Sequence, residues 1–182
     1  MTIKGSVDSA ILARIPIFQG LSDVQRQEVV ALGDVKTLAP GDVLLEQGQT
    51  SQDLWIVLEG SCEVHKQLTS RPATAEPTLL AVLEPFSSIG EMSFFHPAPH
   101  SASVRAKTAA KLFRLPRSRF DELLGRNPGI TSRLAANTIG NLAERMRRMD
   151  DWVVELLAHR PADPRIPEWN ELRRRVFDGW KL

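Results

Sequence analysis

The chain has 182 residues, of which 42% are apolar, so it is long enough for one folded domain with an appended segment. Its 23 basic and 22 acidic residues give a net charge of +1, which argues against a surface dedicated to nucleic acid. The single cysteine, Cys62, excludes an internal disulfide, the N-terminus lacks a signal-peptide pattern, and no apolar run approaches the roughly 18 residues of a membrane span. We therefore expect a cytoplasmic protein with no membrane segment.

A short helix is predicted first, over the sequence "LSDVQRQEVVALGD" at residues 21–34. Ser22 and Gln25 have the spacing of a capping box, in which each side chain bonds the other residue's backbone N–H. From residue 35 the pattern changes to short apolar runs separated by glycine- and proline-containing turns. Further runs of this kind follow a polar loop at residues 69–77 and read "TLLAVL", "SASVRAK" and "KLFRL". Short strands at this spacing predict an all-β sandwich or barrel.

The C-terminal third is predicted to be helical, with a short helix over residues 116–127 and a long one over about 128–158. Apolar residues in the long helix recur at alternating steps of four and three, which is the pattern of a coiled-coil seam. We expect the seam to form a homodimer, although a helix packed on its own domain would also bury apolar residues. The seam residues are Ala135, Ile139, Leu142, Met146, Met149, Val153 and Leu156.

Residues 160–182 are expected to form a separate tail, because prolines at positions 161, 164 and 167 break the long helix. A short amphipathic helix is expected near its end. The basic run at 173–175 is interpreted as a solvated face, with an acidic protein partner as the alternative.

Five segments in their observed order carry a family resemblance: "IPIFQGLS", "PGDVLLEQGQTSQDLWIVLEGSCEV", "LEPFSSIGEMSFF", "PHSASVRA" and "LFRLPRSRFDELL". Together they resemble the cyclic nucleotide-binding domain of bacterial catabolite activators and kinase regulatory subunits. The resemblance covers residues 12–158 and implies a double-stranded β-helix, or jelly roll. A short N-terminal helix and the long C-terminal helix would flank the roll.

The resemblance also implies a cassette for the phosphate and ribose of a cyclic nucleotide, such as cyclic AMP or cyclic GMP. A short helix would begin near the glycine and present backbone N–H groups to an anion. The matching glutamate would accept a hydrogen bond from a ribose hydroxyl, or would simply cap the turn. The expected cassette residues are Gly90, Glu91, Met92, Ser93, His100, Ser101 and Ala102.

His100 departs from the family pattern, which has an arginine at this place. Arginine offers a permanent charge and a two-pronged grip, whereas an isolated histidine is mostly neutral at pH 7. Arg105 is not expected to substitute, because strand alternation places it on the opposite face from His100. Base recognition is also in doubt, since Ala135 and Ala136 stand where the activators have hydroxyl residues.

Two functional hypotheses follow. The first is a ligand-sensing regulatory module that binds a cyclic nucleotide weakly or another small anion; the second is a protein-interaction scaffold that has lost its ligand. Direct DNA binding is not expected, because the match leaves too few residues for a DNA-binding domain. An enzyme is not expected either, since no nucleophile–base or metal-ligand spacing emerges. The histidine–glutamate ligand set of a metal-binding cupin is likewise missing from the sequence.

Overall fold

The structure, a computed structural model, describes residues 2–3, 7–68, 72 and 75–159. The chain divides into two compact units, Met1–Ile139 and Gly140–Leu182. One helix, α5 (Pro128–His159), contributes residues to both units. The amphipathic helix and the basic run predicted in the tail at 160–182 lie outside the described residues.

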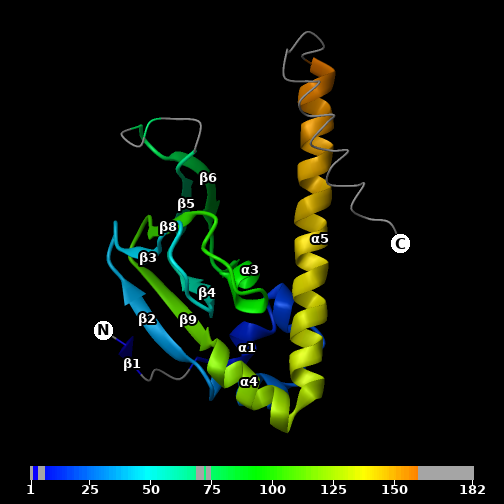
Figure 1. The fold of residues 1–182 in the computed structure, drawn as a ribbon. Coiled ribbons are helices and arrows are strands. Elements are labelled where there is room, and N and C mark those ends of the chain that lie inside the picture. Colours follow the sequence, from blue (N-terminus) through cyan, green and yellow to red (C-terminus); the bar gives the residue numbers. More distant parts are fainter. Residues whose placement is uncertain (1, 4–6, 69–71, 73–74, 160–182) are drawn as a thin grey trace. The chain divides into compact units, whose positions relative to one another are not determined.

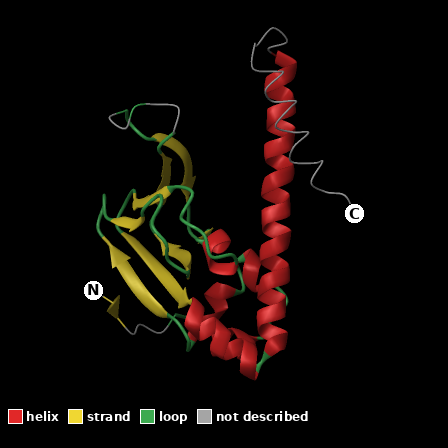
Figure 2. Ribbon diagram, viewed as in Figure 1, coloured by secondary structure: helices red, strands yellow, loops and turns green. Residues whose placement is uncertain are grey.

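Among its described residues, the first unit contains nine strands in two antiparallel sheets. The arrangement, drawn in Figures 1 and 2, confirms the predicted jelly-roll class. The five-stranded sheet has the order β1-β2-β9-β4-β7, and the four-stranded sheet has the order β3-β8-β5-β6. In the first sheet the strands are β1 (Thr2–Ile3), β2 (Asp34–Leu38), β9 (Ala110–Pro116), β4 (Asp53–Glu59) and β7 (Ser88–Ile89). In the second they are β3 (Val43–Leu45), β8 (Ser103–Ala106), β5 (Cys62–Lys66) and β6 (Thr78–Leu83).

Alternation along the strands divides the apolar side chains of this unit between two cores. On β4, Leu54, Ile56 and Leu58 join the core that contains the helical residues, whereas Trp55 and Val57 join the other core, between the two sheets. Both cores are thus built on the same strand. The side of β4 that bears Trp55 is the side on which the candidate site lies.

The N-terminal helices are α1 (Ser9–Leu12), the 3-10 helix η1 (Pro16–Phe18) and α2 (Asp23–Val30). The capping box predicted from the sequence is confirmed. Gln25 N–H donates to the Ser22 hydroxyl at 3.3 Å, and Ser22 N–H donates to the Gln25 side-chain oxygen at 2.9 Å. These bonds satisfy two of the donors that a helix start leaves unpaired.

Two helices follow the last strand: α4 (Arg117–Arg126) and α5. At the start of α5, Ile130 and Leu134 are fully buried in the core that contains the helical residues. The first turns of α5 are therefore anchored by apolar burial, which supplies most of the stability of such a helix.

The predicted seam runs along the rest of α5, and several of its side chains are exposed in the single chain. Ile139 is 67% exposed and Met149 is 57% exposed, and Met146 is exposed as well. Leu156 belongs to the helix, but its side chain lies outside the described residues.

Among the described helices, none is both long enough and apolar enough to cross a membrane.

Candidate functional site

Gly90 sets the geometry of the predicted cassette by joining β7 to the short helix α3 (Glu91–Phe95). Its φ of +87° is in the left-handed region, which glycine adopts without strain. A Cβ atom at this position would lie 2.6 Å from the backbone oxygen of Asp53 on β4. Glycine is therefore required twice over, for the turn and for the close contact that holds the start of α3 against β4.

The first turn of α3 buries two of the predicted polar residues. Glu91 is 5% exposed, and one of its carboxylate oxygens accepts a hydrogen bond from the Ser88 hydroxyl. Ser93 is also buried, and its hydroxyl donates to the Gly90 carbonyl at 3.1 Å. Met92 instead points outward and is exposed. The turn therefore combines a buried carboxylate with a buried hydroxyl.

His100 lies next to this turn, 7% exposed, and its backbone is fixed to the loop that precedes β4. Its N–H donates to the Gln49 carbonyl at 2.8 Å, and its carbonyl accepts from the Gly48 N–H at 2.9 Å. The imidazole bridges two hydroxyl groups, with Nε2 2.8 Å from Ser51 Oγ and Nδ1 3.3 Å from Ser93 Oγ. Both ring nitrogens thus have partners within the protein.

These contacts assign the proton of the neutral ring to Nδ1. A serine hydroxyl has one hydrogen, and that of Ser93 is donated to Gly90. Ser93 therefore accepts from Nδ1–H, while Nε2 accepts from the hydroxyl of Ser51. Burial lowers the pKa of His100 below its usual 6.5, and the nearby negative charge of Asp53 opposes part of that shift. The side chain that replaces the expected arginine is consequently uncharged near neutral pH.

The remaining predicted cassette residues are less enclosed. Ser101 is exposed and Ala102 is half-buried, and both precede β8. Arg105 on β8 is exposed between the buried residues Val104 and Ala106, so it points away from the core between the sheets. This confirms the alternation argument that Arg105 does not replace the missing arginine.

The start of α5 offers little for recognising a base. Ala135 and Ala136 have no hydrogen-bonding side chains, and the nearby Thr138 hydroxyl donates to the Leu134 carbonyl at 2.8 Å. That hydroxyl is buried and committed within the helix. The doubt raised by the sequence about base recognition at these positions therefore stands.

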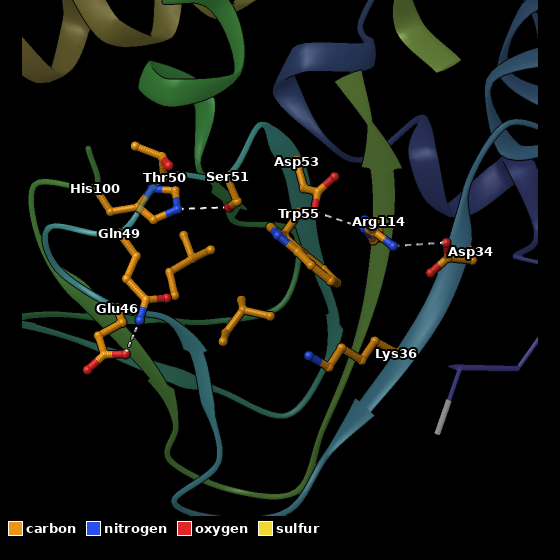
Figure 3. Close-up of a pocket in the computed structure, with 12 residues that line it drawn as sticks. Asp34, Lys36, Glu46, Gln49, Thr50, Ser51, Asp53, Trp55, His100 and Arg114 are labelled. Carbon is orange, nitrogen blue, oxygen red and sulfur yellow. Dashed lines mark hydrogen bonds and ion pairs between the residues drawn. The ribbon is translucent and has the colours of Figure 1, made fainter. Parts of the chain in front are cut away.

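Sequence reasoning missed Ser51, although it bonds directly to His100. The two residues are 49 positions apart, and their contact depends on how the loop before β4 folds against the cassette. No local pattern around Ser51 indicates such a role. The same loop borders a pocket of about 360 Å³ that reaches from His100 to Trp55 and Arg114 (Figure 3).

Taken together, the cassette can hold an anion through neutral donors and can accept hydrogen bonds from a polyol. The N–H groups of the first turn of α3 have no partners within the helix, as at every helix start. Glu91 supplies the acceptor for a hydroxyl group. Protonation of His100 would add a cation next to the turn, at the cost of moving a charge into a buried position.

Comparison with known proteins gives a consistent result. A family profile described as "Cyclic nucleotide-binding domain" matches residues 35–127. The chain is 27% identical over 152 residues to a "CRP-like cAMP-activated global transcriptional regulator" of Mycobacterium tuberculosis, covering 81% of this chain and 62% of that protein. It is 26% identical over 135 residues to a "cAMP-dependent protein kinase regulatory subunit" of Pyricularia oryzae, covering 74% of this chain and 33% of that protein. The chain thus spans less than two thirds of either relative.

A solved structure also aligns with most of the chain. It is the N-terminal domain of a transcriptional regulator from Streptomyces coelicolor, with 31% sequence identity and a TM-score of 0.65. The alignment covers 79% of this chain and 94% of that domain.

Proposed function

Because the chain belongs to the cyclic nucleotide-binding domain family, we propose that its roll is a non-enzymatic sensor that binds a cyclic nucleotide weakly, or another small anion. The observation that carries this proposal is the burial of Glu91 and Ser93 beside His100, in a turn held by Gly90. Glu91 would accept a hydrogen bond from a sugar hydroxyl. The first backbone N–H groups of α3 would hold the phosphate.

His100 gives this proposed site a dependence on pH. In the free protein the imidazole is neutral, since burial lowers its pKa and both nitrogens are bonded to serine hydroxyls. A phosphate beside it favours the protonated form. Binding then takes up a proton, and the affinity rises as the pH falls toward the lowered pKa of the free protein.

We expect cyclic AMP and cyclic GMP to bind more tightly at about pH 6 than at about pH 7.5, by up to about thirtyfold if one proton is taken up. Isothermal titration calorimetry at the two pH values measures this difference. His100→Gln keeps hydrogen-bonding capacity without titrating, so its affinity should not change between the two values. Absence of heat at both pH values with millimolar nucleotide would contradict the nucleotide proposal.

A ligand-free scaffold is the second candidate, and the contacts of His100 favour it. Both ring nitrogens are satisfied by Ser51 and Ser93, so the imidazole needs no ligand to complete its hydrogen bonds. In this case the roll would support a surface for a protein partner. His100→Arg distinguishes the two candidates.

In either case we propose that the seam of α5 forms a homodimer. Ile139, Met146 and Met149 are exposed apolar side chains at the predicted spacing, and a partner helix would remove them from water. If α5 has two positions and the ligand binds one of them more tightly, ligand binding would shift α5 toward that position and would alter the dimer.

We expect light scattering of the parent protein to give about twice the monomer mass. The double variant with Leu142→Glu and Met149→Glu should give a lower mass. Placing two carboxylates per chain in an apolar seam should raise the dimer dissociation constant at least about tenfold. Val154 is an exposed apolar residue outside the seam, so Val154→Glu serves as the control and should leave the mass unchanged. A monomeric parent protein would refute the seam proposal.

A further inference from the structure

The pocket beyond His100 has the size of a small-molecule site and lies outside the cassette. It opens between the loop before β4 and the inner face of the five-stranded sheet, with a volume of about 360 Å³. Pockets that hold small molecules start at roughly this volume. Side chains of β2, β4 and β9 form its sheet side, and His100 is the single cassette residue in its wall (Figure 3).

An unpaired donor lies in this pocket. Trp55 is 5% exposed, and its indole Nε1 is buried with no hydrogen-bond partner among the residues that the structure describes. Figure 3 shows this nitrogen at the end of the ring nearest Ser51. Buried polar groups in folded proteins are almost always hydrogen-bonded. An acceptor supplied from outside the chain would satisfy the indole N–H.

The charges around Trp55 indicate what kind of acceptor fits. Arg114 lies between two carboxylates, with Nε 3.0 Å from Asp53 and Nη1 3.7 Å from Asp34, so its charge is already balanced. The Nζ atom of Lys36 lies over the Trp55 ring, 5.5 Å from the ring centroid. No carboxylate of the described residues is within ion-pair distance of Lys36. The ammonium of Lys36, which has no carboxylate partner among the described residues, therefore lies over the same indole ring whose N–H is unpaired.

Two further features of the pocket indicate which class of ligand it fits. Leu44 and Leu45 give one wall of the pocket an apolar surface, and Glu46 lies exposed at the rim, where it accepts a hydrogen bond from Gln49 at 2.7 Å. The Glu46 carboxylate is thus hydrogen-bonded to Gln49 and not to Trp55. The lining suits an oxyanion attached to a small apolar body more than it suits a bare anion.

We propose that this pocket is a second ligand site, for a small organic oxyanion whose oxygen accepts from Trp55 Nε1–H and pairs with the ammonium of Lys36. The site does not require nucleotide binding at the cassette. Carboxylates and phosphates share the necessary oxyanion chemistry, and probes with the same phenyl group distinguish them.

The test is an NMR titration of the ¹⁵N-labelled full chain, in which the four tryptophans give separate indole N–H signals and Trp55→Phe identifies that of Trp55. Benzoate and phenyl phosphate are added to millimolar concentration, with benzyl alcohol as the uncharged probe. We expect at least one anion to move the Trp55 indole proton downfield and saturably, because a new acceptor bonds it. Benzyl alcohol should have no such effect.

Lys36→Gln should weaken binding of the active anion about tenfold or more, since a charge-assisted bond is lost. Lys111→Gln makes the same charge change outside the pocket and should leave the affinity unchanged. No saturable shift with either anion would overturn the proposal, as would equal binding of benzyl alcohol or equal effects of the two lysine variants. If cyclic AMP alone shifts Trp55, the pocket belongs to the nucleotide and the second site is refuted.

Discussion

Replacing His100 with arginine is expected to raise the affinity for cyclic AMP about tenfold to a hundredfold at neutral pH. The gain follows from a permanent charge and two charge-assisted hydrogen bonds, each stronger than a neutral bond by about 1 kcal/mol or more. The imidazole of the parent is neutral at this pH, because burial lowers its pKa. Calorimetric titration of parent and variant measures the difference.

The same substitution tests whether the rest of the cassette is intact. Glu91 and Ser93 are buried at the start of α3, so a positive side chain next to them would complete the site. His100→Gln serves as the control, since it changes the side chain without adding charge. A His100→Arg variant that remains folded, by thermal unfolding, and gains no affinity would favour the ligand-free scaffold.

Gly90→Ala is expected to lower the free energy of unfolding by about 2–4 kcal/mol, the largest stability loss that we predict for a single methyl group. Its φ of +87° disfavours any side chain by about 1–2 kcal/mol. The new Cβ would also meet the Asp53 backbone oxygen at 2.6 Å, so β4 and α3 must move apart. Urea unfolding of the variant and the parent measures the loss.

Gly41 provides a matched control for this prediction. It has nearly the same φ, +89°, but an added Cβ there would meet no atom within 4 Å. Gly41→Ala should therefore lose only the conformational part of the free energy of unfolding, about 1–2 kcal/mol. Equal losses in the two variants would show that contact with Asp53 contributes nothing at Gly90.

The sequence was most informative where structure depends on neighbouring residues. The capping box at Ser22 and Gln25, the strand at residues 78–83 and the long helix were all readable from local patterns, and the structure contains each of them. Strand alternation also predicted that Arg105 does not substitute for the missing arginine, and the structure places this residue exposed between two buried ones. These features follow from hydrogen-bonding rules and side-chain periodicity over a few residues.

The site was predictable in part. Gly90, Glu91 and Ser93 are close together in sequence, and the structure places them in one turn. The bond between Ser51 and His100 was not predictable, because it joins residues 49 positions apart and depends on the folded loop. The pocket at Trp55 escaped for the same reason, since β2, β4 and β9 meet only in the sheet.

The enclosure of His100 between two serines has a consequence for how this chain can evolve. Histidine and arginine codons differ by a single base, so the arginine of the family pattern is one mutation away. That mutation would remove the imidazole partners of Ser51 and Ser93 and place a larger side chain between them.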